Sequence, residues 1–201
     1  MKIRDSGMPG EEMWSGFFEP KAMLERLGLA TGMQTVVDIG CGYGVPAAWM
    51  IERYPQATVY GIDPDRIRVR VASLALQKAG VIRTNQAPAV PSVNPRADLV
   101  LMFDMIHFLT DAELEQTLER LRPVMRSNGR LIIRMVVRPR QRPSKTWRME
   151  NWKHRLYKTA PHYRTVEYIQ NQMARAGLRL EKTTPSGSVG ESIWLIAKPV
   201  L

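Results

Sequence analysis

Three closely spaced glycines are the residues of this sequence best suited to binding a ligand. Gly40, Gly42 and Gly44 lie between a predicted buried strand and a helix for which Pro46 is a favourable start. Glycine has no Cβ atom and adopts positive φ readily, so the backbone here can approach a ligand closely. A tight turn between strand and helix needs the same residues, so the loop alone does not identify a ligand.

Two carboxylates flank this loop. Asp38 comes two residues before the first glycine and could accept hydrogen bonds from a cationic amino group or from the loop's own amides. Asp63 ends the next predicted strand, where a carboxylate could accept hydrogen bonds from both hydroxyls of a ribose. Ligands of doubly wound sheets bind beyond the carboxyl ends of the strands, and both side chains are expected there.

The order of the predicted elements favours a single α/β domain. Strands alternate with helices, which is typical of a largely parallel sheet covered by helices on both faces. The strands are predicted at 35–39, 58–62, 81–84, 98–103, 130–137, 178–184 and 192–198. We expect one domain over 1–201, in which 1–30 form an N-terminal cap with the first helix and 138–164 form a basic insertion that covers the substrate.

Short-range signals set the ends of two helices. The helix after the second strand is predicted to run to about Lys78, with Gly80 as its stop. Thr110 and Glu113 have the spacing of a capping box for the helix after the fourth strand.

The runs DIGCGYG and GIDPD, which contain these glycines and carboxylates, resemble the cofactor signature of class I S-adenosylmethionine-dependent methyltransferases. In that family the glycine loop holds the amino-acid part of the cofactor, and the acid after the second strand holds its ribose. The resemblance, good over residues 30–137, implies S-adenosylmethionine as cofactor. The implied fold is a doubly wound, Rossmann-like domain whose seven-stranded sheet is mostly parallel with an antiparallel last strand. The cofactor-binding residues it implies are Asp38, Gly40, Cys41, Gly42, Tyr43, Gly44, Asp63, Pro64, Asn85, Gln86 and Phe103.

A nicotinamide or flavin dinucleotide protein is the rival interpretation. Its G-x-G-x-x-G fingerprint does not fit, because the third glycine comes one residue too early and Val45 stands in its place. The sequence also departs from the methyltransferase pattern after the third strand, where the family often has an acid that binds the adenine amino group. Asn85 and Gln86 are the candidates there, since their amide oxygens could accept that bond; both could equally be solvated loop residues.

The end of the fourth strand is expected to face the methyl group. The chain lacks the Asn-Pro-Pro-aromatic motif of the family's aminomethylating branch and instead resembles the small-molecule branch, which often has L-x-H-x-L where this chain has MIHFL. Asp104 and His107 are therefore the candidate catalytic residues, since either could remove a proton from an acceptor. Packing at a helix start is the alternative role for His107.

The net charge of +10 is concentrated in one segment. Residues 126–164 contain 12 basic side chains and one acidic one, and the remaining chain is close to neutral. For the basic segment 138–164, four interpretations stay open: a lid with solvated charges, capture of an anionic or acyl-bearing substrate, docking to an acidic carrier protein or an anionic membrane surface, and RNA binding. The candidate substrate-binding residues are Trp14, Arg138, Tyr157, His162 and Tyr163.

The composition narrows the setting. One cysteine cannot form an internal disulfide, which favours a cytoplasmic location, and three scattered histidines do not suggest a metal site. No apolar run approaches the roughly 18 residues of a membrane-spanning helix. We expect methyl transfer to a small or lipid-like acceptor, with RNA methylation second and a non-catalytic cofactor-binding partner third; an oligomer stays open.

Overall fold

The computed structural model of the protein describes residues 32–137, 147–149, 152, 161–186 and 191–200. The predictions for residues 1–30, including Trp14, and for Arg138, Tyr157 and most of the basic segment lie outside the described residues. Within the described ranges, no helix is long and apolar enough to cross a membrane.

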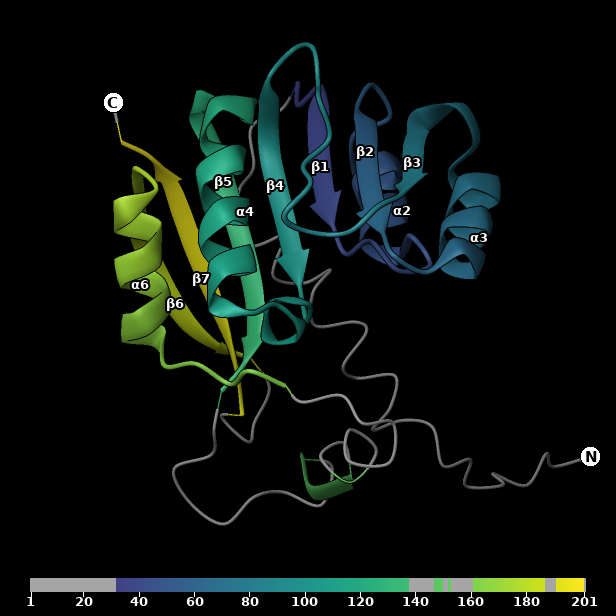
Figure 1. Ribbon diagram of the computed structural model, residues 1–201. Coiled ribbons are helices and arrows are strands. Elements are labelled where there is room, and N and C mark those ends of the chain that lie inside the picture. The colour runs from purple at the N-terminus through teal and green to yellow at the C-terminus, as the bar shows by residue number, and fades with distance from the viewer. Residues whose placement is uncertain (1–31, 138–146, 150–151, 153–160, 187–190, 201) are drawn as a thin grey trace, which may run out of the picture. The chain divides into compact units, whose positions relative to one another are not determined.

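In the described part of the chain, seven strands form one sheet (Figure 1), in the spatial order β3-β2-β1-β4-β5-β7-β6. They are β1 (Thr35–Ile39), β2 (Thr58–Asp63), β3 (Gly80–Thr84), β4 (Ala97–Phe103), β5 (Met125–Val136), β6 (Leu178–Ser186) and β7 (Ser192–Pro199). The pairs among β1 to β5 are parallel, and β7 is antiparallel to both β5 and β6. The expected mostly parallel, seven-stranded sheet with an antiparallel last strand is confirmed.

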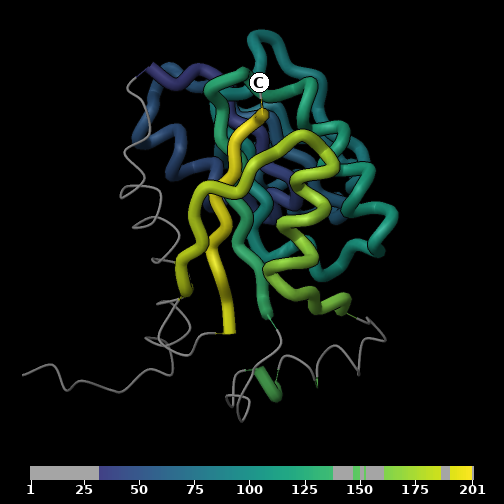
Figure 2. The backbone as a smooth tube through the Cα atoms, turned by 90° about the vertical axis from the view of Figure 1, so that its left-hand side faces the viewer, coloured from purple at the N-terminus to yellow at the C-terminus, as the bar shows by residue number. Residues whose placement is uncertain are grey.

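Helices cover both faces of this sheet, as Figure 1 and the turned view in Figure 2 show. On one face lie α2 (Val45–Arg53) and α3 (Arg66–Leu76), and on the other α4 (Asp111–Val124) and α6 (Val166–Arg175). Leucines at 114, 118 and 121 recur on one side of α4 and are fully buried in the core against the aliphatic side chains of β4 and β5. Burial of this stripe fixes how α4 lies across the sheet.

The capping box at the start of α4 is confirmed. The Thr110 hydroxyl accepts a hydrogen bond from the Glu113 amide at 3.3 Å, and the Glu113 carboxylate accepts one from the Thr110 amide at 2.8 Å. Two main-chain donors that the helix itself cannot pair are thereby satisfied.

Two predicted boundaries are wrong. The helix predicted to run to about Lys78 ends at Leu76, a 3-10 turn (Gln77–Ala79) follows, and Gly80 begins β3. A Cβ at Gly80 would lie 2.6 Å from that of Leu76, so this glycine lets strand and helix approach closely. The fifth strand begins at Met125 rather than Arg130, because its pairing with β4 shifts register and residues 126–129 bulge within one continuous strand.

Candidate functional site

The glycine loop leaves the carboxyl end of β1 and folds back over β2. All three glycines have left-handed φ angles, between +54° and +81°. The amides of Gly40 and Cys41 both donate to the Ile62 carbonyl, at 2.8 and 3.0 Å. A Cβ at Gly40 would come within 2.9 Å of the Met105 side chain, so the loop can lie under the end of β4 only with glycine there.

Asp63 is a buried carboxylate at the end of β2 that fixes this loop. One of its oxygens accepts the Gly42 amide at 3.0 Å, and the other accepts the Asp65 amide at 2.9 Å. A carboxylate has about four lone-pair positions, so each oxygen can accept a further hydrogen bond from a ligand. The side chain is therefore oriented in advance for a second pair of donors.

Asp38 is a second buried carboxylate, one strand away. Its side chain is 1% exposed, and its Oδ2 atom has no hydrogen-bond partner. Burial, and secondly the negative charge of Asp63, raise the pKa of Asp38 to about 7. An unpaired buried oxygen beside another carboxylate favours a cationic partner.

A cavity of about 490 Å³ opens at this edge of the sheet. Six predicted cofactor residues and one predicted catalytic residue line it: Gly40, Asp63, Pro64, Asn85, Gln86, Phe103 and Asp104. Apolar side chains of Ile62, Ala87, Met105, Phe108 and Leu109 complete much of its wall. Apolar walls combined with carboxylates and amides are typical of a site for a nucleoside-sized molecule.

Five of the predicted cofactor residues are not in the cavity lining: Asp38, Cys41, Gly42, Tyr43 and Gly44. Cys41 is buried behind the loop, and burial raises the pKa of its thiol far above the usual range, which makes a reactive thiolate unfavourable. The Tyr43 side chain is exposed, and its ring lies 5.7 Å from the Arg68 guanidinium. Of the loop residues, Gly40 lines the cavity and Gly42 donates its amide to Asp63.

Asn85 and Gln86 follow β3 and are both exposed at the cavity rim. The Asn85 amide donates to the Asp63 carbonyl at 3.1 Å, and its side-chain oxygen accepts the Gln86 amide at 2.9 Å. The turn therefore already uses one lone pair of that oxygen, and a second remains for a donor from a ligand.

Asp104 lies where the chain turns out of β4 and lines the cavity. Its φ of +52° is in the left-handed region, which aspartate tolerates better than most residues. The Asp104 carboxylate forms an ion pair with Arg134, whose guanidinium also donates to Ser186 Oγ at 3.0 Å. Arg134 was not predicted, and nothing local marks it, because its partners are 30 and 52 residues away in the chain.

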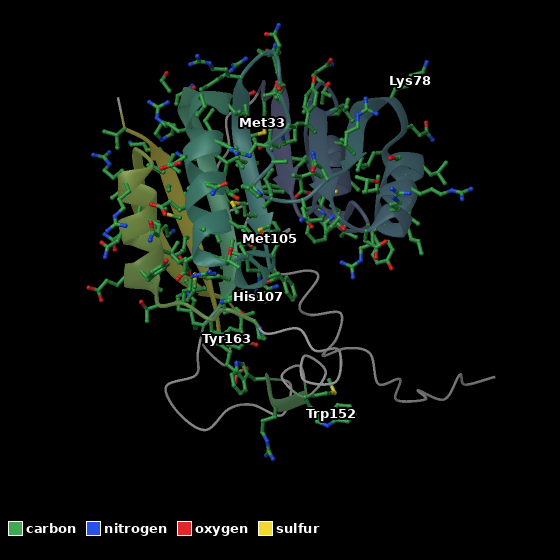
Figure 3. All side chains as sticks on the ribbon, in the orientation of Figure 1. Met33, Lys78, Met105, His107, Trp152 and Tyr163 are labelled. Atoms are coloured by element: carbon green, nitrogen blue, oxygen red, sulfur yellow. The ribbon has the colours of Figure 1, made fainter. Side chains whose placement is uncertain are left out.

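His107 lies in a 3-10 turn (Ile106–Phe108) beside the cavity, but it is not in the lining. The centroid of its buried ring lies 4.2 Å from that of Phe108 and 6.1 Å from that of Tyr163. Its main-chain carbonyl accepts a hydrogen bond from the His162 amide at 2.7 Å. Figure 3 shows His107 and Tyr163 near one another at this end of the sheet. The structure thus brings His162 and Tyr163 next to His107, in an arrangement of packing and main-chain hydrogen bonds.

Arg164 is a buried residue that the sequence did not single out. Its guanidinium donates to the carbonyls of Ile106 and Leu109, at 2.8 and 2.6 Å, and pairs with Asp111 at 2.8 Å. The side-chain hydrogen bond from Arg164 is the main cause that lowers the pKa of Asp111. Arg164 therefore joins the end of the basic segment to the cavity wall and to the start of α4.

No group of three or more histidine, cysteine or acidic side chains that could hold a metal ion is found among the described residues.

Comparisons with known proteins identify the family to which this chain belongs. The family model described as "Methyltransferase domain" matches residues 16–183. Methyltransferase GfsG from Streptomyces halstedii is 31% identical over 182 residues, which cover 82% of this chain and 62% of that protein. Trans-aconitate 2-methyltransferase from Azoarcus sp. (strain BH72) is 36% identical over 94 residues, 44% of this chain and 35% of that protein. The chain thus spans between one third and two thirds of the length of these curated relatives.

Solved structures share the fold. Magnesium protoporphyrin IX methyltransferase (ChlM) from Synechocystis PCC 6803, a structure with bound SAH, superposes with a TM-score of 0.68 at 18% identity. The match covers 93% of this chain and 83% of that one. At this identity the likeness establishes the arrangement of helices and strands.

Proposed function

This chain belongs to the class I S-adenosylmethionine-dependent methyltransferases, and we propose that it transfers the methyl group of S-adenosylmethionine to a small or lipid-like acceptor, anionic acceptors included. The observation that carries the proposal is the Asp63 carboxylate, which is buried, lines the cavity and is held by two main-chain amides. A carboxylate so placed can accept both hydroxyls of a ribose through charge-assisted hydrogen bonds.

The remaining residues of the site fit the same cofactor. Asp38, with its unpaired buried oxygen, is proposed to balance the positive amino group of the methionine end. Asn85 and Gln86, at the rim beyond β3, are proposed to bind the adenine edge. Phe103 is proposed to contact the cofactor from the end of β4, because it lines the same cavity.

When bound, the cofactor supplies a methyl group that its sulfonium already activates. The protein's main task is then to hold the acceptor in line with that group, which can supply much of the acceleration. Asp104 lies in the cavity wall at the end of β4 and is proposed to contact the acceptor. His107, which packs just behind this wall, is proposed to orient the acceptor or to accept a proton from it.

An anionic acceptor is supported by two observations. The basic side chains of residues 126–164 outnumber the acidic ones by 12 to one, and this segment returns to the cavity wall at His162 and Arg164. One relative is named for trans-aconitate, a carboxylate, and a comparable acceptor is proposed for this chain.

Calorimetric titration of the full chain with S-adenosylhomocysteine tests the cofactor site. We expect Asp63→Ala to weaken binding at least about tenfold, because hydrogen bonds to a charged group contribute roughly 1.5–3 kcal/mol each. Glu119→Ala, which removes an exposed carboxylate on α4, is the matched control and should bind like the parent. No uptake by the parent, or equal affinity of Asp63→Ala, contradicts the proposal. Transfer of labelled methyl groups to a panel of carboxylic acids, phenols and acyl esters then tests the acceptor class.

A further inference from the structure

Helix α3 has two apolar stripes, and only one of them is buried. Val69, Ala72 and Leu76 face the sheet in the core. Ile67, Val71 and Leu74 recur at i, i+4 and i+7 on the opposite side, where they are 72%, 43% and 70% exposed. An isolated exposed leucine needs no explanation, but a stripe along a whole helix indicates a surface that contacts something.

Cations flank the exposed stripe on both sides. At 100° per residue, Arg66 and Arg70 lie on one side of the stripe and Arg68 on the other, and all three are exposed. Lys78, in the 3-10 turn after the helix, is a further exposed cation, and Figure 3 labels it. The acidic residue at the start of this helix, Asp65, is engaged by two amides of the first turn and lies 3.5 Å from Arg68. The exposed face therefore has a positive charge around an apolar centre.

We infer that this face of α3 docks onto an anionic lipid bilayer. A helix that lies in a membrane surface places an apolar stripe among the acyl chains and lysine and arginine side chains among the phosphates, which is the arrangement found here. An 11-residue helix is only about 16 Å long. One face of so short a helix presents less than the area of about 800 Å² that each partner buries in a stable protein interface.

The docking face lies next to the cavity. Arg68 is exposed on α3 and also lines the cavity, and Pro64 and Asp65, just before the helix, line it as well. Contact of α3 with a bilayer would bring the cavity close to the lipid surface. The docking itself does not depend on the proposed methyl transfer and is tested separately from it.

The test is flotation of the full chain with vesicles of phosphatidylcholine alone and of phosphatidylcholine with phosphatidylglycerol. We expect binding to the anionic vesicles that falls at least about fivefold in Ile67→Gln/Leu74→Gln and in Arg66→Gln/Arg70→Gln. Two controls separate this face from other exposed apolar side chains and from exposed charge elsewhere on the protein. Val200→Gln removes another exposed apolar side chain, and Arg175→Gln/Lys182→Gln removes two exposed cations outside α3; both should bind like the parent.

The variants change exposed side chains only, so unfolding curves and S-adenosylhomocysteine affinity should match those of the parent. Loss of vesicle binding in both α3 variants, with both controls intact, supports the inference. Absence of binding by the parent, or equal loss in the control variants, overturns it. A dimer in sedimentation that Ile67→Gln/Leu74→Gln dissociates also overturns it, because a second copy would then cover the stripe.

Discussion

Asp38 and Asp63 have the same side chain one strand apart, and their surroundings give them different properties. Asp63 is held by two main-chain amides and is oriented toward the cavity. Asp38 is buried with one oxygen unpaired, and its pKa is raised to about 7. The proposed roles follow from this difference: Asp63 for neutral hydroxyls, and Asp38 for a cation that would favour its charged form.

The raised pKa of Asp38 predicts how stability depends on pH. Between about pH 4 and 7 the folded protein retains a proton at Asp38 that the unfolded chain has released, so this residue makes the free energy of unfolding fall as pH rises. We expect Asp38→Asn to reduce that fall by a few kcal/mol at most, since one pKa unit corresponds to about 1.4 kcal/mol. Urea unfolding of the parent and of Asp38→Asn at pH 5 and pH 7.5 measures this difference in the free energy of unfolding. If the free energy of unfolding changed equally with pH in the parent and the variant, the raised pKa of Asp38 would be contradicted.

At the level of elements, the site depends on hydrogen bonds to main-chain carbonyls that join distant segments. Arg164 donates to the carbonyls of residues 106 and 109, and the His162 amide donates to the His107 carbonyl. The wall of the cavity after β4 is thus fixed by residues that come more than 50 positions later in the chain. Arg164 is best described as a residue that positions this wall.

Removal of the Arg164 guanidinium should destabilise the protein more than removal of its partner charge. Arg164→Met removes the guanidinium donor of the buried Leu109 carbonyl and one of the two donors of the Ile106 carbonyl, which keeps the Leu109 amide, and we expect the free energy of unfolding to fall by about 2–4 kcal/mol. Asp111→Asn weakens an ion pair whose carboxylate is 69% exposed, so a loss of less than about 1 kcal/mol is expected. Equilibrium unfolding in urea compares them. Equal small losses would show that the carbonyl hydrogen bonds contribute little.

How much could be predicted from the sequence follows from the range of each interaction. The glycine loop, the strand at 35–39 and the capping box depend on neighbours within a few residues, and all three are confirmed. The ion pair of Arg134 with Asp104 and the hydrogen bonds of Arg164 depend on how strands and loops meet in space, and no local pattern marks either arginine among the 12 basic residues of 126–164. Gly80 is intermediate: the local pattern predicts a helix stop, whereas the structure shows a glycine that allows close approach to Leu76.

At the scale of the whole molecule, the sheet topology gathers residues from four parts of the chain at one edge. The carboxyl ends of β1, β2, β3 and β4 deliver Gly40, Asp63, Asn85 and Asp104 to a single cavity. Parallel neighbours make this possible, because their carboxyl ends share an edge. The proposed membrane-docking face on α3 and the basic segment lie outside this set of cavity residues. We expect them, rather than the cofactor residues, to determine which acceptor or surface the protein recognises.

The uneven distribution of charge permits a test of RNA as the acceptor. The cations of residues 126–164, apart from the paired Arg134 and the buried Arg164, should bind RNA at low salt, with an affinity that falls steeply as salt rises. If RNA were the acceptor, its binding and that of S-adenosylhomocysteine would be coupled, and each would change the affinity of the other by the same factor. A small-molecule enzyme predicts no such coupling, so we expect saturating RNA to change S-adenosylhomocysteine affinity by less than about twofold in calorimetric titrations. A change of tenfold or more with a structured RNA, retained at physiological salt, would contradict the small-acceptor proposal and leave the cofactor site as described.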